Sequence, residues 1–281
     1  MKLLAMLPLA AVLALAYGGS SDDWQVEDHE TINRTFQVGS GAGARRLLVD
    51  NMNGFIHVTA NGGSQVRVSV ERHTTAESKA ALADAKRDVK LEMSQQGNEV
   101  RLYVDSPSRH NDHGDRYDKY RVRLDYEIEV PREIELVLKN MNHEIQVNGT
   151  SGNFEVHGMN GGIDMEGVAG SGFVNTLNGK IRVAFARNPD HDTSFHTLNG
   201  KVDIYFQEPL NADLRFHTLN GGVWADFDVA PDPSSVSGQN GHLIYSSARS
   251  NRNGSGRVGS GGPVLTLNSL NGAIRLHTKT Q

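Results

Sequence analysis

Two stretches of eleven residues in this chain have nearly the same sequence, and this repeat restricts the folds that the chain can adopt. HTLNGKVDIYF at 196–206 is followed 21 residues later by HTLNGGVWADF at 217–227. Eight asparagines align on this pattern: Asn53, Asn142, Asn160, Asn178, Asn199, Asn220, Asn240 and Asn271. From Asn142 onward their spacings are 18, 18, 21, 21, 20 and 31 residues. A repeat of this length indicates one structural unit that buries its apolar face against its own copies.

Each of these asparagines lies between two short apolar patterns. The residue three positions after the asparagine is apolar in every copy: Ile56, Ile145, Ile163, Ile181, Val202, Val223, Leu243 and Ile274. The residue four positions before it is also apolar: Val49, Leu138, Val156, Val174, Phe195, Phe216, Val236 and Leu267. The positions between are mostly polar. Alternation with period two predicts a strand with one buried face on each side of the asparagine.

The Asn-Gly pair, present in seven of the eight repeats, predicts a corner. Both residues tolerate positive φ, so the pair lets the chain bend where most residues would clash. A tight hairpin is one interpretation of Asn-Gly. The even period instead favours stacked coils, in which each strand pairs with its copy about 4.8 Å away. The fold class we predict is all-β, a single β-solenoid of parallel β-helix-like coils of about 18–21 residues, with one short helix in the N-terminal half.

Like residues would then stack on like in such a solenoid. We predict a structural ladder of corner asparagines, with amide donors and acceptors paired along the stack. Its members would be Asn160, Asn178, Asn199 and Asn220. Thr176, Thr197 and Thr218, each two residues before its asparagine, would stack in the same way.

The rest of the chain divides around this repeat. We expect a signal peptide at 1–16, a lead-in strand at 17–46, a less regular first part of the solenoid at 47–137 with a helix near 75–92, and regular repeats at 138–281 with a flexible loop at 246–262. The helix is predicted from the stretch TAESKAALADAKRDVKLEM, which is rich in good helix formers.

The N-terminus predicts export. Lys2 precedes the apolar run LLAMLPLAAVLALA, and ALA at 14–16 offers a cleavage site, as in secretory signals. The run is too short to span a bilayer, although an uncleaved anchor is the alternative. We therefore expect the protein in the periplasm, at the cell surface or secreted, and peripheral to the membrane at most. The chain has no cysteine for a disulfide, and its net charge of −5 without a basic cluster argues against nucleic acid as a partner.

In their order, these motifs resemble those of a known family. They are VDNMNGFIHVTA (49–60), YEIEVPREIELVLKNMNHEIQVNG (126–149), the series GMNGGIDM, TLNGKIRV, TLNGKVDI and TLNGGVWADF, and LTLNSLNGAIRLHT (265–278). The chain resembles, over about residues 36 to 278, the bacterial β-strand-repeat family described as adhesins, whose biochemical function is unknown. The resemblance implies an exported β-solenoid-like domain with an adhesive or scaffolding role, and it brings no catalytic residues. His143 departs from the pattern, because the other repeats mostly have glycine there.

Two histidine groups are candidate metal ligands. RHNDHGDRYD (109–118) places His110, His113 and Asp115 close together, a donor set that suits zinc. His196 and His217 would stack on adjacent coils of an outer face. A solvated loop and an exposed polar column explain these residues equally well, so we predict no metal and no cofactor. The G-x-G-x-x-G in GSGRVG (254–259) precedes a strand pattern, not a helix, so we expect no dinucleotide site there.

Three charged residues share one predicted outer column. Asp164, Arg182 and Asp203 follow on consecutive repeats, and alternating charges at this spacing attract. Asp164 and Asp203 could form the carboxylate pair of a glycosidase, but Arg182 lies between them.

We therefore predict a non-enzymatic protein that binds a surface protein or glycan through an outer face, with Trp224, His196 and His217 as candidate contacts. The alternative is an envelope polysaccharide-acting enzyme, or a metal-dependent binding protein, on the same solenoid. Acids and histidines are diluted by Asn, Arg and Lys in the outer columns, which favours binding over catalysis.

Overall fold

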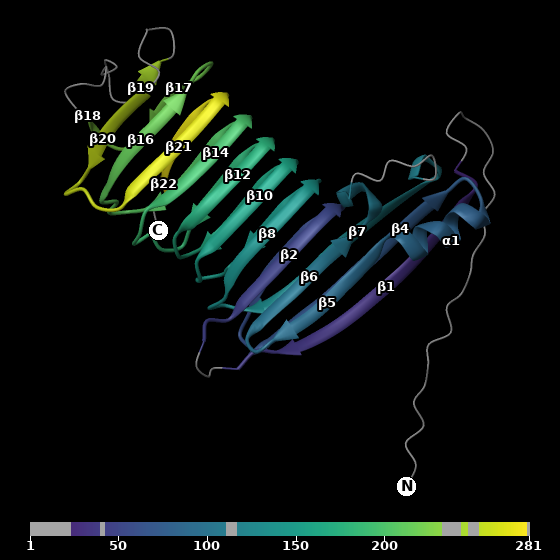
Figure 1. Ribbon diagram of the computed structural model, residues 1–281. Coiled ribbons are helices and arrows are strands. Elements are labelled where there is room, and N and C mark those ends of the chain that lie inside the picture. The colour runs from purple at the N-terminus through teal and green to yellow at the C-terminus, as the bar shows by residue number, and fades with distance from the viewer. Residues whose placement is uncertain (1–23, 40–42, 111–116, 232–242, 247–252, 280–281) are drawn as a thin grey trace.

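The computed structural model describes residues 24–39, 43–110, 117–231, 243–246 and 253–279. Within them the chain is mostly β-strand, arranged in two eleven-stranded sheets with one α-helix (Figure 1). The all-β prediction is therefore confirmed. The predicted signal peptide lies outside the described residues, as do residues 247–252 of the predicted flexible loop.

Both sheets mix parallel and antiparallel pairs. The first sheet has the order β1 (Val26–Gln37), β4 (Gln65–Ala76), β7 (Tyr120–Pro131), β3 (Ile56–Asn61), β9 (Ile145–Asn148), β11 (Ile163–Val168), β13 (Ile181–Phe185), β15 (Val202–Gln207), β22 (Ile274–Lys279), β17 (Gly222–Ala225) and β19 (Leu243–Ser246). The second has the order β18 (Ala230–Pro231), β20 (Asn253–Val258), β16 (Ala212–Thr218), β21 (Val264–Asn271), β14 (Thr193–Asn199), β12 (Gly172–Asn178), β10 (Phe154–Asn160), β8 (Glu135–Asn142), β2 (Arg46–Asn53), β6 (Glu99–Asp105) and β5 (Lys90–Gln96).

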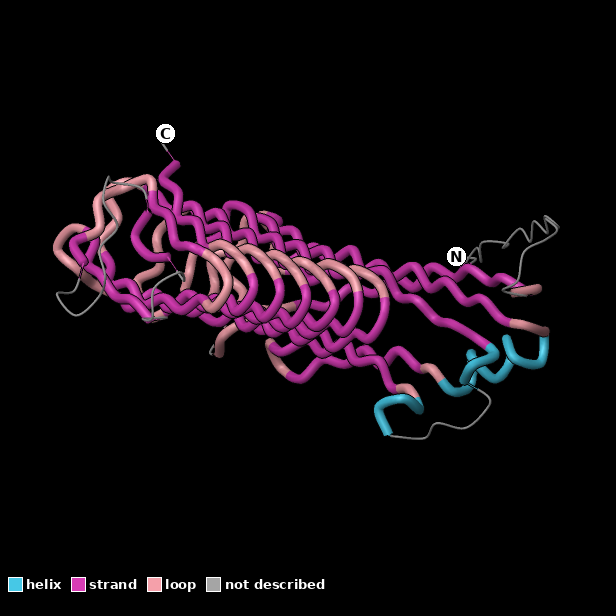
Figure 2. Tube along the Cα trace, turned by 90° about the horizontal axis from the view of Figure 1, so that it is seen from above, coloured by secondary structure: helices cyan, strands magenta, loops and turns pink. Residues whose placement is uncertain are grey.

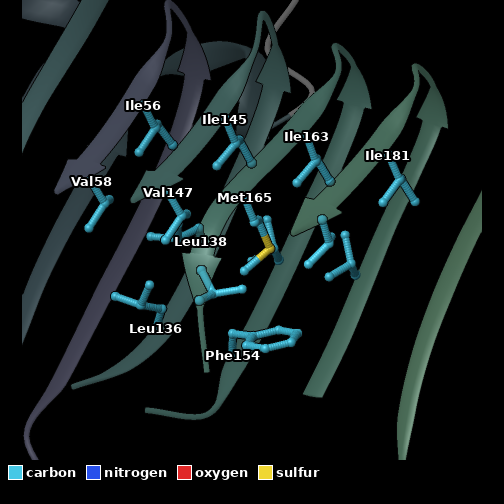
Figure 3. Packing of buried hydrophobic residues seen from close by; sticks show 14 of the residues in the cluster. Ile56, Val58, Leu136, Leu138, Ile145, Val147, Phe154, Ile163, Met165 and Ile181 are labelled. Atoms are coloured by element: carbon cyan, nitrogen blue, oxygen red, sulfur yellow. The ribbon is translucent and has the colours of Figure 1, made fainter. Parts of the chain in front are cut away.

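In the middle of the molecule the repeats stack as coils. Six of the corner asparagines end a strand of the second sheet, and a strand of the first sheet begins three residues later; they are Asn53, Asn142, Asn160, Asn178, Asn199 and Asn271. Neighbouring coils pair in parallel, residue on equivalent residue, so that Ile145 lies beside Ile163 and Ile163 beside Ile181. These isoleucines are fully buried between the sheets, in one row with Ile56 (Figure 3). Burying each such side chain contributes about 1.5–3 kcal/mol, which is why this column is apolar in every copy.

The coils do not stack in sequence order at the C-terminal end. The last coil, β21 and β22, inserts between the coil of β14 and β15 and the coil of β16 and β17. In Figure 1 the yellow β21 lies between the green β14 and β16. Val202 thus pairs with Ile274, and Ile274 with Val223, so the predicted stacking of each repeat on the next one in the sequence is wrong at this point.

The physical reason is that all copies present the same edge. Apolar residues at every second position and an Asn-Gly corner let any copy pair with any other, and the period does not encode which one. After β17 the chain continues in strands that pair antiparallel, with β19 on β17 and β20 on β16. These strands occupy the outer edges of that coil, which leaves its inner edges to the C-terminal strands. The repeat aligned on Asn240 therefore forms no coil: Leu243 pairs antiparallel with Trp224.

The N-terminal part departs from a single solenoid as well. The coil that contains Asn53 pairs directly with the coil of Asn142, through β2 with β8 and β3 with β9. Between these two coils the chain adds antiparallel pairs, with β4 between β1 and β7 and with β5 on β6, while β6 and β7 pair in parallel with β2 and β3. The lead-in strand is β1, which lies at the edge of the first sheet.

The helix α1 (Lys79–Asp88) is shorter than the predicted range 75–92. Ser78 begins it, because its hydroxyl accepts a hydrogen bond from the backbone amide of Ala81 at 3.2 Å. The predicted range is too long because its first residues belong to β4 and Lys90 begins β5. The helix buries Ala81 and Ala85 and lies near the N-terminal end of the molecule (Figure 2).

Candidate functional site: the asparagine corner and the outer faces

The corner asparagines form a ladder of side-chain hydrogen bonds. Asn160 donates from Nδ2 to Oδ1 of Asn142 at 3.1 Å, and Asn178 donates to Asn160 at 2.9 Å. Asn199 continues the row by donating to Asn178 at 2.7 Å. Each side-chain N–H group in the row is paired with the side-chain oxygen of the neighbouring asparagine, so the ladder holds the coils in register. In Figure 2 the loops that join the two strand layers lie one behind another along the molecule.

The ladder continues through the inserted coil. Asn271 donates to Asn199 at 2.7 Å, and Asn220 donates to Asn271 at 2.7 Å. Asn199 and Asn220 are therefore not neighbours, contrary to the sequence prediction. We call the row Asn142, Asn160, Asn178, Asn199, Asn271 and Asn220 the asparagine ladder.

The corner glycines are required for a reason that the sequence argument did not give. Gly161, Gly179 and Gly200 do not adopt positive φ, so the predicted left-handed bend is wrong at these corners. A Cβ at Gly161 would lie 1.9 Å from the carbonyl oxygen of His143, and one at Gly179 would lie 2.1 Å from that of Gly161. Glycine is needed because the backbone of the neighbouring coil passes too close for any side chain.

A column of hydroxyl groups supports the corner from inside. Thr176 donates to the carbonyl oxygen of Gly161 at 2.9 Å, and Thr197 donates to that of Gly179 at 2.9 Å. In the C-terminal coils, Ser269 and Thr218 bond the carbonyls of Gly200 and Gly272. These hydroxyl residues are buried, so they satisfy carbonyls that would otherwise lack a partner.

His143 forms a corner of another kind. It is the only non-glycine residue with positive φ (81°) in the part of the chain that the structure describes. Its Nδ1 accepts a hydrogen bond from the backbone amide of Gly54 at 3.2 Å. Gly54 itself has φ 114°, and a Cβ there would meet the carbonyl oxygen of Leu124. His143, which departs from the repeat pattern, thus links the N-terminal coil to the regular stack through its side chain.

A row of large apolar side chains runs beside the ladder. The residue before each ladder asparagine is Met or Leu, and four of these residues are well exposed: Met159 by 43%, Leu177 by 42%, Met141 by 38% and Leu198 by 38%. Met52, Leu270 and Leu219 continue the row and are half-buried. We call these seven residues the apolar ridge. At the strand spacing of about 4.8 Å it is about 29 Å long.

The sequence argument missed the ridge, although its signal is plain. Met or Leu precedes the asparagine in every repeat except that of Asn240, and strict period-two alternation would place one of these two residues inside. In β14 the burial alternates as far as Thr197, and then Leu198 and Asn199 are both exposed. The chain bends around the corner at this point, so both side chains lie on the convex side.

The outer face of the first sheet carries a charge network. Arg182 donates to Asp164 at 2.9 Å and to Glu166 at 2.7 Å, and Lys279 donates to Glu166 as well. Partial burial alone would lower the pKa of Arg182, but its hydrogen bonds to Glu166 and Asp164 raise that pKa above its ordinary value. Burial would likewise raise the pKa of Glu166, but its bonds to Lys279 and Arg182 hold that pKa below its ordinary value.

The network continues onto the inserted strand. The ring of Tyr205 lies between the guanidinium of Arg182, 5.1 Å from its centroid, and the stacked ring of His277 at 4.5 Å. His277 Nδ1 lies 2.8 Å from a carboxylate oxygen of Asp226, and its Nε2 lies 4.0 Å from Asp203. These contacts fasten β22 between β15 and β17.

The structure places the predicted carboxylates as the sequence suggested. Arg182 pairs with Asp164 on one side and with Asp203 on the other. Arg182 lies on the strand between those of the two acids, and its guanidinium donates a hydrogen bond to Asp164. The three residues form a column of alternating charge in which Arg182 forms an ion pair with Asp164.

The three predicted contact residues do not share a surface. Trp224 lies in β17 of the first sheet, whereas His196 and His217 lie in the second. Asn268 of the inserted coil pairs with both histidines, so they are not on adjacent coils as predicted. Burial lowers the pKa of His196 below its ordinary value. The indole of Trp224 lies over Gly222, where a Cβ would meet three of its ring atoms at 2.5–2.9 Å.

The structure describes only some of the residues predicted as candidate metal ligands. His110 ends a short 3-10 helix, and His113 and Asp115 lie outside the described residues. Among the residues that are described, no three His, Asp or Glu side chains are placed to hold a metal ion. The predictions for the loop at 109–118 remain predictions.

A hollow of about 290 Å³ adjoins the N-terminal end of the ridge. Met52, Asn53 and Asn142 line one side, and Val122 and Leu124 of β7 line another. Its lining combines apolar side chains with asparagine amides, as the apolar ridge and the asparagine ladder do at the corner. In the described part of the chain, no helix is both long enough and apolar enough to cross a membrane.

Comparison with known proteins adds little. No protein-family model matches the chain, and no curated protein matches it. Among solved structures it is similar to a "putative cell adhesion protein" from Clostridium sporogenes, 11% identical over 90% of this chain and 100% of the other, with a TM-score of 0.36. A "putative adhesin" from Bacteroides fragilis is 11% identical over 88% and 97%, with a TM-score of 0.36.

A "putative lipid binding protein" from Parabacteroides distasonis is 9% identical over 88% of this chain and 96% of the other, with a TM-score of 0.25. At these identities and scores the likeness carries no argument about family or activity.

Proposed function

We propose that this chain is an exported, non-enzymatic binding protein of the adhesin or envelope-scaffold kind, and that it contacts its partner through the apolar ridge. The observation that carries the proposal is the ridge itself. Soluble proteins seldom leave large apolar side chains exposed in one continuous row, and such patches typically mark contact surfaces. A repeated surface also suits many weak contacts to one extended partner, strengthened by avidity when copies cluster.

The repeated part works as a short β-solenoid in this proposal. Each of its coils contains one strand of each sheet. The coil that comes last in the sequence, β21 and β22, lies between the coil of β14 and β15 and the coil of β16 and β17. Close backbone contact at the corner glycines and the asparagine ladder make it rigid. A rigid edge loses little conformational entropy when it binds, which favours recognition over a long, straight front.

The ionisable groups of the outer face support binding over catalysis. Arg182 already bonds both Asp164 and Glu166, and His277 already contacts Asp226. Groups that neutralise one another stabilise the sheet and are poorly placed to exchange protons with a substrate. For the alternative of a polysaccharide-acting enzyme, the structure offers no observation in its favour among the described residues.

Export rests on the N-terminal sequence, with its basic start, apolar run and small residues at 14–16. The partner we propose is a protein or glycan of the envelope or cell surface. A net charge of −5 without a basic patch makes nucleic acid a poor partner.

The test compares the mature chain with a ridge variant in pull-downs from envelope extracts and on glycan arrays. The ridge variant is Met159→Gln/Leu177→Gln/Leu198→Gln, which removes apolar surface without adding charge. The matched control is Ser194→Gln, in the same strand as Leu198 and on the outer face of the same sheet. We expect at least a tenfold loss of captured partner for the ridge variant and no change for the control. Equal capture by all three proteins would rule out the ridge as the contact surface.

A further inference from the structure

The ridge and the ladder together form two parallel rows with one period. Every coil contributes one Met or Leu and one asparagine, so apolar groups and amides recur every strand, about 4.8 Å apart. No residue in either row is charged. A partner that follows this surface over its whole length has to repeat at the same spacing. Another stack of the same coils has that spacing by construction.

We infer that the partner of the ridge is a second copy of this chain, packed ridge to ridge and in parallel, with a twofold axis along the coil stack. The inference rests on the proposed function, because it names the partner of the surface proposed there. Each Met or Leu then meets its own copy across the axis, and the interface is self-complementary, as a twofold interface requires.

The ladder has the hydrogen-bonding capacity that such a pair needs. The four inner members of the row each donate one of their two N–H groups and accept at one of two lone pairs: Asn160, Asn178, Asn199 and Asn271. The remaining N–H and lone pair are left for contacts off the ladder axis. A second ladder presents the same donors and acceptors at the same period, whereas a lipid surface or an unrelated protein does not.

Charges on the two flanks of the ridge decide the orientation. On the first-sheet side, two residues after each asparagine, lie Glu144, Lys180 and Lys201. On the second-sheet side, three residues before it, the ionisable side chains are Lys139, His157, His196 and His217. In the described part of the chain, Glu144, Lys139, Lys180 and Lys201 make no internal ion pair, so they are available to a neighbour.

Parallel packing brings each first-sheet flank against the second-sheet flank of the other copy, coil by coil. Glu144 then faces Lys139 of the second copy, twice in the pair by symmetry. Lys180 faces Asn175, and Lys201 faces His196, whose pKa is lowered by burial. Antiparallel packing instead brings the first-sheet flanks together and sets Lys180 of the central coil against Lys180 of its copy. Like charges at such contacts oppose association, so the parallel pair is favoured.

A lipid surface is a poorer occupant of the ridge. Peripheral attachment to anionic membranes relies on a cluster of basic residues beside the apolar face. Here the flanks carry both signs, and the chain has a net charge of −5. The ridge is also narrow, so we expect a weak pair that forms as the concentration of the chain rises.

Single-cysteine variants test both the pair and its direction, because the natural chain has no cysteine. Leu177→Cys, Met141→Cys and the control Ser194→Cys are each oxidised with copper–phenanthroline and oxygen, and dimers are counted on non-reducing gels. The parallel pair predicts disulfide-linked dimers for Leu177→Cys and Met141→Cys, at least fivefold above Ser194→Cys. Dimers of Leu177→Cys without those of Met141→Cys would overturn the parallel direction. Dimer levels like the control for both would overturn the pair.

A second measurement separates this inference from the proposed function. Sedimentation velocity of the unlabelled mature chain should show a dimer that grows with concentration, and Met159→Gln/Leu177→Gln/Leu198→Gln should abolish it. If the natural chain stays monomeric while the same variant loses envelope binding, the pair is wrong and the binding role of the ridge stands. If the natural chain forms the dimer but the variant binds the envelope as well as the natural chain does, the pair stands and the ridge is not the envelope contact.

Discussion

Asn271 donates its side-chain amide to Asn199, a residue 72 positions earlier in the chain, at 2.7 Å. Asn220, which follows Asn199 by one repeat in the sequence, instead bonds Asn271 from the other side at 2.7 Å. These two hydrogen bonds show that the C-terminal coil lies inside the stack, between the coils of Asn199 and Asn220. The consequences reach the stability of the fold and the surface that the ridge presents.

The inserted coil should be among the slowest parts of the molecule to exchange amide hydrogens. β22 is paired on both edges, with β15 and with β17, although it is the last strand in the sequence. Hydrogen–deuterium exchange should show protection of 274–278 comparable with that of β13 and β15. Fast exchange in 274–278 beside a protected β15 would show that the last coil frays as a chain end and is not held inside the stack.

The corner glycines should not tolerate alanine. A Cβ at Gly179 would lie 2.1 Å from a backbone oxygen of the neighbouring coil, so the coils would have to separate. We expect Gly179→Ala to lower the free energy of unfolding by about 3 kcal/mol or more, measured by chemical denaturation. Gly62 is the matched control, because a Cβ there meets nothing within 4 Å. Gly62→Ala should change stability by about 0.5 kcal/mol or less, and equal effects at the two sites would refute the steric account.

The register of the first sheet can be tested with two adjacent residues. Ile181 is fully buried and Lys180 is exposed. Ile181→Asp places a carboxylate without a partner in the core, and we expect a loss of about 3–5 kcal/mol or a failure to fold. Lys180→Asp should cost about 0.5 kcal/mol or less. Denaturation midpoints that ranked the two variants in the opposite order would mean that the strand is shifted by one residue.

The charge network on the first sheet should make stability depend on pH. The pKa of Glu166 in the folded chain is held below its ordinary value of 4.5 by Lys279 and Arg182, against the effect of burial. A lowered pKa means that the stabilisation is complete above about pH 4.5 and is lost as the pH falls through the folded pKa. Glu166→Gln should therefore destabilise the protein at pH 7 and have little effect at strongly acidic pH.

The size of that effect is modest because Glu166 is 41% exposed, so we expect about 0.5–1 kcal/mol at pH 7. The control is Glu133→Gln, an exposed carboxylate for which the described residues supply no ion pair. A Glu166→Gln variant with the same loss at pH 7 and at acidic pH would show that the ion pairs do not stabilise the sheet.

Several features of the site were open to prediction from the sequence. The alternation around each asparagine predicts which side chains are buried, because a strand sends successive residues to opposite faces. The same alignment predicts that Asp164, Arg182 and Asp203 share an outer column. The apolar ridge could have been found too, since Met or Leu precedes each ladder asparagine, but it requires knowing that the chain bends there.

Local pattern in this sequence determined the unit: two short strands, a glycine corner and an apolar inner face. It determined neither the order of the units nor the reason for the glycines. Every copy presents the same donors, acceptors and apolar columns along its edges, so the pairing of β15 with β22 and not with β17 depends on where later strands leave an edge free. The need for Gly179 likewise exists only once Gly161 lies against it. Periodicity is a property of neighbours in sequence, whereas register between coils and close backbone contact arise between segments that meet only in the folded chain.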